Sequence, residues 1–591
     1  MSARRPAGAD AIADAHFPGA SGASGASGAS TAPGPRALIG PRLLRTFEGT
    51  APTLRILAAI SHGEASGVTL FRAKNVVSPG QLRELSAALQ AARPAGDPPL
   101  VIGLDQEGGQ LQAIDYGATS WPGNLAIGAT GSEDLARRAG RAIATEVAAM
   151  GGTLVFAPDS DVLHRESATA LGTRPFGGDP ALVARLAAAM TEGIQDVGIA
   201  AVLKHFPGHG AATGDSHLGM PVLGRDLAGL EAEELVPFRA GIAAGARTVL
   251  PGHLGVPALT DGVAVPATVS RALLHGLLRD RLGFAGVTVS DAMDMGGASA
   301  AGGIEATAVA AVGAGMDLLL LVHDPDTEDA VLAALAAAAG DGRLDPADLD
   351  ASRERILALR RWLAGGAQPA LEAVGCAEHR ALAAEIARRA VTLVRDRDAM
   401  LPLRPGSRVA LIAPVPVDLT PAETSSYVRL ALAGALRDRG LAVDELVSPL
   451  DPTPAQSAAL ASAAVAARPD AILVGTFDAH GCRGQAGTVR AAVATGRPVL
   501  AVALRGPFDV ETYPEAPAAA CTYGVQPPLM EALADALVGR IPFAGRLPVA
   551  LADREPSGRD DPAPAGRARE LMDGVGPAAG HPDHASRETR S

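Results

Sequence analysis

The hydrophobic pattern between residues 43 and 322 repeats regularly. Short apolar runs rich in β-branched residues alternate with longer Ala-, Leu-, Glu- and Arg-rich stretches of helical character. We expect strands at 43–48, 67–71, 100–104, 153–157, 199–203, 247–251, 286–290 and 317–322. We expect helices at 78–92, 132–150, 180–197, 226–245, 270–282 and 303–315. Alternation of this kind implies parallel strands and predicts an α/β fold, a (β/α)8 TIM-type barrel.

A second α/β pattern follows the first after a helical connector. Its apolar runs predict strands at 409–413, 471–476, 499–504 and 519–523. The predicted domains are a catalytic barrel at 42–365, a helical connector at 366–397 and an α/β sandwich domain with a mainly parallel sheet at 398–552. The Gly-, Ala-, Pro- and Arg-rich ends, 1–41 and 553–591, are expected to be disordered tails.

Composition and charge exclude several function classes. The formal net charge is −13, which argues against nucleic acid as a main partner. No apolar segment follows Arg4 and Arg5 as a signal peptide would require, and no later stretch is an uninterrupted membrane span, so we expect a cytoplasmic protein. The three cysteines show no disulfide or metal-site spacing. The oligomeric state is open, and a monomer is assumed.

Polar residues gather just after the predicted barrel strands. In a TIM-type barrel these positions form the carboxyl-terminal rim, where active sites lie. A random scatter of polar residues would not follow strand ends in this way. The residues concerned are Asp105, Asp159, Asp161, Lys204, His205, His253, Asp291 and His323.

The densest group of such residues is the segment KHFPGHG at 204–210, followed by GDSH at 214–217. Gly and Pro disfavour a helix here and predict a loop. Asp215 and His217 are two residues apart, so the carboxylate could fix the imidazole tautomer while the other ring nitrogen transfers a proton. The alternative is a pair of loop-stabilising hydrogen bonds. His205 and His209 have the spacing of a helical metal pair, but the predicted loop argues against one, and we expect neither metal nor cofactor.

Three further residues are candidates for substrate chemistry. Asp291 ends the seventh predicted strand, where a rigid element could aim a nucleophilic carboxylate into the barrel mouth. It could equally be a helix N-cap. Asp105 lies beside the Gly108–Gly109 turn, and Arg174 lies in GTRPFG at 172–177. Either could bind a sugar, or the glycines could only make a turn and Arg174 only pair with Asp161.

Together these motifs resemble glycoside hydrolase family 3, in its bacterial β-N-acetylglucosaminidase (β-hexosaminidase) branch and two-domain form. The resemblance covers about 42–552 and includes DQEGG at 105–109, FAP-x-x-DV at 156–162, GTRPFG, KHFPGHG, GDSH, PATVS at 266–270 and SDAMDM at 290–295.

The resemblance implies a role for each matching residue. Asp291 would be the nucleophile, and His217 the general acid/base oriented by Asp215. The resemblance assigns sugar binding to Asp105, Arg174, Lys204 and His205. The implied reaction is removal of terminal β-linked GlcNAc from chitooligosaccharides or muropeptide fragments, with retention of configuration through a glycosyl-enzyme.

Several alternatives stay open at this stage. A neutral imidazole would not repel phosphate as a carboxylate base would, so a β-glycoside phosphorylase is a rival, as is a β-glucosidase. Many members of the branch have Arg where this chain has Gln110 and Ala113, which puts the aglycone in question. A sugar-binding protein without activity and a metal-dependent hydrolase are the options outside this class.

The loop that carries His217 has glycine hinges and is expected to close over bound sugar. The second domain is expected to contribute stability and walls around the cleft but no catalytic residue. Within it, we expect Asp509 and Glu511 to be surface charges.

Overall fold

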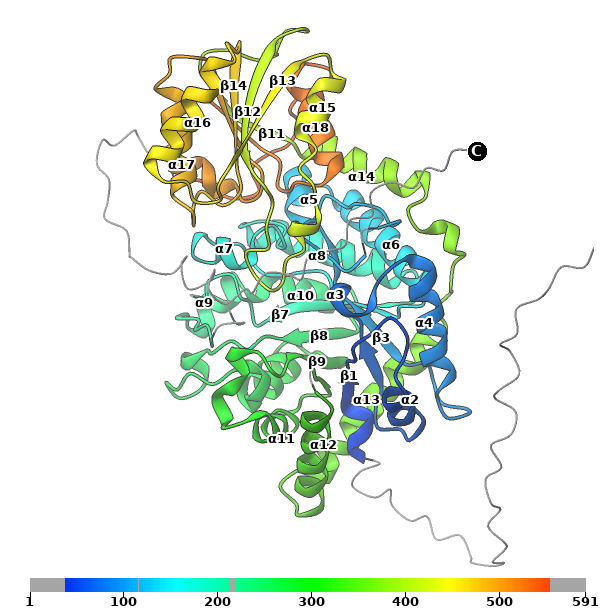
Figure 1. The fold of residues 1–591 in the computed structure, drawn as a ribbon. Helices are drawn as coiled ribbons and strands as arrows, with labels where there is room; N and C mark the ends of the chain where they lie inside the picture. The colour runs from blue at the N-terminus through cyan, green and yellow to red at the C-terminus, as the bar shows by residue number, and fades with distance from the viewer. Residues whose placement is uncertain are drawn as a thin grey trace, which may run out of the picture. The chain divides into compact units, whose positions relative to one another are not determined.

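The eight apolar runs predicted from the sequence form the strands of a barrel (Figure 1). The computed structural model describes residues 38–552, with gaps at 115, 213, 215, 217–218 and 323. Within this part of the chain, eight parallel strands close in the order β1-β10-β9-β8-β7-β6-β3-β2. Their bounds are β1 Leu43–Arg45, β2 Gly67–Thr69, β3 Val101–Leu104, β6 Leu154–Val155, β7 Ala200–Phe206, β8 Thr248–Pro251, β9 Val287–Ala292 and β10 Leu318–Leu320. The predicted fold class is thus confirmed.

The strands are buried on both faces. Leu44, Phe156, Val202 and Val289 pack inside the barrel, while separate apolar clusters lie between the strands and the surrounding helices. Burial on both faces explains why the strands read as continuous apolar runs rather than alternating ones. Residues 1–37 and 553–591, which include most of the two predicted tails, lie outside the described residues.

Several helices of the barrel part begin at residues whose side chains cap them. The hydroxyl of Ser132 accepts a hydrogen bond from the main-chain N–H of Leu135, and the hydroxyl of Ser78 accepts one from the N–H of Gln81 at the start of another helix. The predicted helix at 226–245 is divided into two. The helices of this part are α2 Leu54–Ser61, α3 Arg72–Asn75, α4 Pro79–Ala91, α5 Asn124–Thr130, α6 Glu133–Ala149, α7 Ala168–Leu171, α8 Pro180–Gln195, α9 Leu227–Ala232, α10 Leu235–Ala243, the π-helix Ala272–Arg281, α11 Ile304–Ala314, α12 Pro325–Gly340, α13 Pro346–Leu363 and α14 Ala377–Ala390.

A second sheet follows, with the order β11-β16-β15-β14-β12-β13. Its strands are β11 Thr392–Asp396, β12 Arg408–Pro414, β13 Ala442–Ser448, β14 Ala471–Thr476, β15 Val499–Ala503 and β16 Ala518–Cys521. Helices α16 (Pro454–Ala466) and α17 (Gly484–Val493) cover one face, and α15 (Leu432–Asp438) and α18 (Pro527–Leu537) cover the other (Figure 1).

Two of these strands were not predicted. β11 lies in the segment expected to be a helical connector and pairs antiparallel with β16. β13 is an edge strand whose outer residues are partly exposed, so its sequence lacks a continuous apolar run. The sheet is otherwise parallel, as predicted.

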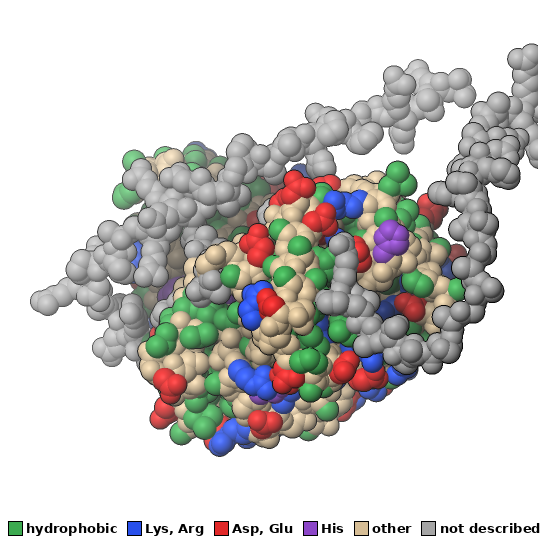
Figure 2. All heavy atoms as spheres, turned by 90° about the horizontal axis from the view of Figure 1, so that it is seen from below, with side chains coloured by type: hydrophobic (Ala, Val, Ile, Leu, Met, Phe, Trp, Pro, Cys, Tyr) green, Lys and Arg blue, Asp and Glu red, His purple; other side chains and the backbone are tan. Residues whose placement is uncertain are grey.

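The described residues form one compact unit. Leu125, Leu163 and Leu171 of the barrel part belong to the same buried apolar cluster as the second sheet. Among the described residues, no helix combines the length and the apolar character needed to cross a bilayer. On the face shown in Figure 2, acidic and basic side chains are interspersed rather than segregated by sign.

Candidate active site

Those predicted site residues that the structure describes line one cleft at the carboxyl ends of the barrel strands. Asp105, Arg174, Lys204, His205 and Asp291 all line it, and its volume is about 490 Å³. This size is within the range of small-ligand sites. Residues separated by up to 186 positions in the chain therefore meet because parallel strands end on the same side of the barrel.

Lys204 and His205 lie within β7 rather than in the loop after it. β7 pairs Lys204 with Leu250 and Phe206 with Pro251, so it carries one extra residue at His205. Such a bulge redirects side chains at the end of a strand. Both residues are almost fully buried, with 2% and 7% of their surface exposed.

Glu107 is a central residue of the site that the sequence analysis did not single out. Its carboxylate accepts hydrogen bonds from Arg174 Nε at 3.0 Å and Nη2 at 2.9 Å, and Lys204 Nζ lies 2.5 Å away. Lys204 also contacts Asp105 at 3.0 Å. Burial favours the neutral form of Glu107, but the charges of Arg174 and Lys204 outweigh it and lower the pKa of Glu107 to about 2.

The hairpin before Arg174 explains how Glu107 reaches this position. β4 (Gln106–Gly108) and β5 (Leu111–Gln112) pair antiparallel through a tight turn. Gly108 and Gly109 both have positive φ, and a Cβ on Gly109 would lie 2.9 Å from the Gly123 Cα. The glycines therefore make the turn, and the turn fixes the charged residues beside it. The sequence signal for Glu107 was its place in the DQEGG motif, two residues after Asp105.

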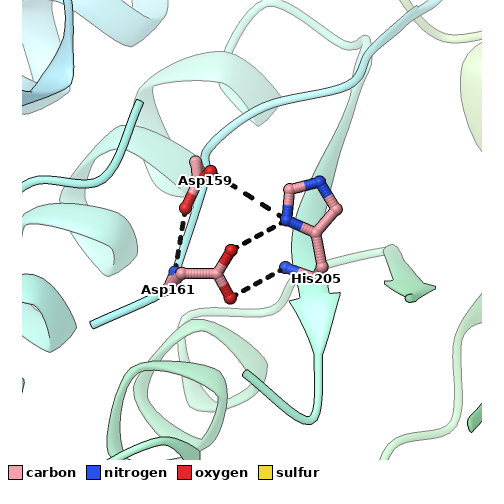
Figure 3. Close-up of side chains that lie close together, drawn as sticks. All are labelled: Asp159, Asp161 and His205. Atoms are coloured by element: carbon pink, nitrogen blue, oxygen red, sulfur yellow. Dashed lines mark hydrogen bonds and ion pairs between the residues drawn. The ribbon is translucent and has the colours of Figure 1, made fainter. Parts of the chain in front are cut away.

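Asp161 orients His205 (Figure 3). One carboxylate oxygen lies 2.8 Å from His205 Nδ1, and the other accepts from the His205 main-chain N–H at 3.3 Å and from that of His209 at 2.6 Å. Arg174 Nη2 lies 3.2 Å from His205 Nε2. Because a guanidinium only donates, Nε2 accepts and Nδ1 carries the proton toward Asp161. Arg174 thus pairs with Glu107 rather than with Asp161, contrary to the alternative left open above.

Asp159 differs from its neighbour Asp161. It is fully buried, and burial together with the charge of Asp161 raises its pKa well above the usual range. For Asp161, burial would also raise the pKa, but His205 outweighs it and lowers that pKa. Asp159, Asp161 and His205 have oxygen and nitrogen atoms close enough to hold a metal ion. Arg174 Nε lies 3.8 Å from Asp159, so a cation there would face a guanidinium.

Asp291 lies in β9 and is followed by a turn, so it is not the N-cap of a helix. His253 positions the residue next to it: His253 Nε2 lies 3.0 Å from the carbonyl oxygen of Ala292 and Nδ1 lies 2.9 Å from Thr268 Oγ1. His253 is fully buried and is not among the cleft-lining residues. His253, predicted to lie at the rim, therefore contacts the main chain beside Asp291 rather than the cleft.

The remaining predicted groups are only partly described. Asp215, His217 and His323 lie outside the described residues. Ser216, between the first two in sequence, lines the cleft, and its carbonyl oxygen accepts from the Gly297 N–H at 3.0 Å. Gln110 is buried and accepts from the Thr173 N–H at 2.7 Å, whereas Ala113 lines the cleft.

The second domain also reaches the cleft. Residues of the segment 418–427 line it, in agreement with the expectation that the second domain contributes walls around the cleft. Asp509 and Glu511, predicted to be surface charges, are instead buried, with 1% and 7% exposed. Glu511 pairs across the domains with Arg165, and Asp509 accepts from Thr476 Oγ1 at 2.7 Å. That prediction was wrong because a charged sequence does not reveal a partner far away in the chain.

Comparison with known proteins places this chain in a family. The pattern of the glycosyl hydrolase family 3 N terminal domain matches residues 44–359. The beta-hexosaminidase of Chromobacterium violaceum is 40% identical over 294 residues, which make up 49% of this chain and 80% of that protein. The beta-hexosaminidase of Pseudomonas aeruginosa (strain LESB58) is 39% identical over 294 residues, or 50% of this chain and 86% of that protein.

Solved structures extend the likeness to both domains. The glycoside hydrolase family 3 beta-N-acetylglucosaminidase from Paenibacillus sp. str. FPU-7 superposes with a TM-score of 0.81 and 32% identity, covering 87% of this chain and 98% of that one. A beta-glucoside phosphorylase at 22% identity, with a TM-score of 0.73 over 88% of this chain and 94% of its own, shares the fold. The family match, the relatives and the barrel-rim cleft agree: this chain belongs to glycosyl hydrolase family 3.

Proposed function

We propose that this protein is a β-hexosaminidase, and more specifically a retaining exo-β-N-acetylglucosaminidase that removes terminal β-linked GlcNAc. The observation that carries the proposal is the convergence of Asp291 with Asp105, Arg174, Lys204 and His205 on one cleft. Relatives that bear the names beta-hexosaminidase and beta-N-acetylglucosaminidase support the choice of sugar. Chitooligosaccharides and muropeptide fragments are the proposed substrates.

Asp291 is the proposed nucleophile. Its carboxylate oxygen forms a bond to the anomeric carbon as the bond from that carbon to the leaving oxygen breaks. His217 gives its proton to the leaving oxygen, and Asp215 orients its ring. In the second step water gives a proton to His217 and attacks the anomeric carbon, which releases Asp291. Ser216, the neighbour of both loop residues, lines the same cleft, which supports their assignment.

Asp105, Arg174, Lys204 and His205 are the proposed ligands of the sugar hydroxyls. Their charges and ring orientation are fixed before substrate arrives, since Glu107 holds two of them and Asp161 a third. Groups held in place by buried partners lose little freedom when a substrate binds. The floor of the cleft is therefore preorganised for a polar ring.

The test is an assay of the purified protein on aryl β-N-acetylglucosaminide and aryl β-glucoside, each with and without phosphate. We expect preference for the N-acetyl sugar, no effect of phosphate, and a first product with β configuration by NMR. A phosphate-stimulated rate that yields sugar 1-phosphate would identify a phosphorylase instead. No turnover of either glycoside would contradict the proposed function.

A further inference from the structure

One wall of the cleft is made by a segment of the second domain far from the catalytic barrel in sequence. We call residues 418–427 the wall segment. It contributes to the cleft lining with Asp418, Pro421, Ala422, Glu423, Thr424 and Tyr427. A substrate bound at Asp291 therefore lies in a space that the barrel alone does not enclose.

The wall segment is held to the barrel by main-chain and side-chain hydrogen bonds. The Thr424 N–H donates to the Gln110 carbonyl oxygen at 2.7 Å, and Thr424 Oγ1 accepts from the Gln112 N–H at 3.1 Å. These bonds fix the wall directly onto the hairpin that carries Glu107. These hydrogen bonds thus fix the position of the wall segment relative to the residues proposed to bind the sugar.

A buried contact with Arg505 and a local contact within the segment also fix it. The carboxylate of Glu423 lies 3.1 Å from Arg505, and both side chains are almost fully buried. Asp418 accepts from the Ser426 N–H at 2.8 Å and from its hydroxyl at 2.6 Å. A surface loop with this many bonds has little freedom to lose when a ligand packs on it.

Tyr427 ends the segment and has an unusual position for this chain. Aromatic residues make up 3% of the sequence, yet Tyr427 is 42% exposed and is one of the residues that line the cleft. The guanidinium of Arg72, from the barrel helix α3, lies 3.9 Å from the centre of its ring. The pair joins the two domains at the cleft through a cation–π contact.

We propose that Arg72 and Tyr427 form the subsite for the leaving sugar. The inference rests on the proposed function, because it takes the barrel floor as the site of the terminal GlcNAc. The face of the Tyr427 ring that Arg72 does not cover can attract the apolar C–H face of a pyranose, and the guanidinium over the other face can donate hydrogen bonds to substituents of that sugar. The subsite recognises a pyranose aglycone, whether the second sugar of a chitooligosaccharide or that of a muropeptide fragment.

The test compares substrates that differ only in the leaving group: chitobiose, GlcNAc–MurNAc and N-acetyl-β-glucosaminyl azide, whose leaving group carries no ring. Tyr427→Ala should lower kcat/KM about tenfold on at least one disaccharide and far less on the azide. Tyr427→Phe should keep most of the disaccharide activity, because stacking does not need the hydroxyl. Arg72→Gln should show the same selectivity with a smaller loss.

Tyr116→Ala is the matched control, since Tyr116 is 76% exposed and is not among the cleft-lining residues. An equal loss on all three substrates, or no loss on any, would overturn the inference while leaving the proposed function intact. Wild-type protein that cleaves none of the three would overturn both. Thermal unfolding of each variant checks that the fold is kept.

Discussion

Two buried charge networks reach the cleft, one from the barrel and one from the second domain, and they differ in how many of their residues line it. The floor network consists of Asp105, Glu107, Arg174 and Lys204, and the wall network of Glu423, Asp478, Arg505 and Asp509. Each surrounds a buried arginine with carboxylates. In the floor network every residue except Glu107 lines the cleft. In the wall network only Glu423 does.

The balance of charge also differs. Glu107 faces two cations and its pKa is lowered to about 2, whereas burial raises the pKa of Glu423 despite the nearby Arg505. Burial and the charge of Asp478 raise the pKa of Asp509 to about 7.

Burial alone would lower the pKa values of Arg174 and Lys204, but nearby carboxylates, Glu107 first, raise both, so these two side chains present positive charge to a ligand. The charged groups of the wall network, by contrast, interact mainly with one another. Burial of charge alone does not identify an active site, but burial combined with access to the cleft does.

The largest expected effect tests whether the cleft that the floor network lines is the catalytic site. Asp291→Ala should lower kcat on an aryl β-N-acetylglucosaminide by about 10⁴-fold or more, because no other group replaces the nucleophile. Circular dichroism should show an unchanged fold. Turnover near the wild-type rate would remove the nucleophile from the proposed mechanism.

The sharpest test of the comparison replaces the buried arginine of each network, Arg174 in the floor and Arg505 in the wall, with lysine. Arg174→Lys loses the forked contact to Glu107 and the contact to His205, so kcat/KM should fall about 10²-fold. Arg505→Lys should lower stability but change kcat/KM on the aryl glycoside by about threefold or less, since Arg505 does not line the cleft. If both variants lost activity equally, the two networks would not differ in function.

The free energy of unfolding should change with pH in opposite directions for the key carboxylate of each network, Glu107 in the floor and Asp509 in the wall. Ionised Glu107 contributes stability that is complete above its ordinary pKa of 4.5 and is lost as the pH falls toward about 2. The difference in unfolding free energy between wild type and Glu107→Gln should therefore shrink as the pH falls below 4.5. Urea unfolding at a series of pH values measures it.

For Asp509 the direction is opposite. Its raised pKa penalises the folded state as the pH rises from 3.8 to about 7. Relative to Asp509→Asn, wild type should gain stability as the pH falls through this range. A change of the same sign in both variants would show that the two networks do not differ in charge balance.

The smallest effect concerns the wall segment. Asp418→Ala removes both hydrogen bonds to Ser426 and should loosen the wall. We expect about a threefold loss of kcat/KM on chitobiose and a smaller one on the glycosyl azide, since one or two exposed hydrogen bonds contribute little. An unchanged rate on chitobiose would mean that the remaining contacts suffice to fix the wall.

Much of the barrel could be predicted because its strands are buried on both faces and keep apolar runs. The convergence of Lys204, His205 and Asp291 followed from their places at strand ends. β13 could not be predicted in this way, since Asp444 and Glu445 interrupt its apolar pattern at an exposed sheet edge. β11 depends on antiparallel pairing with a strand more than a hundred residues away, which local pattern does not encode.

The site was predictable to a lesser degree. Glu107 acts through buried contacts with Arg174 and Lys204, which are distant in sequence. The pairing of Arg72 with Tyr427 depends on how two domains meet. Such contacts are determined by tertiary packing and cannot be predicted from residue type or spacing.

The apolar cluster shared by the two domains decides how this chain can be divided. Leu125, Leu163 and Leu171 of the barrel part pack in one cluster with the second sheet. A fragment limited to residues 44–359 would expose that surface to water, and such patches promote aggregation. We therefore expect that residues 44–359 of this chain do not fold stably alone and that the two domains melt in a single cooperative transition.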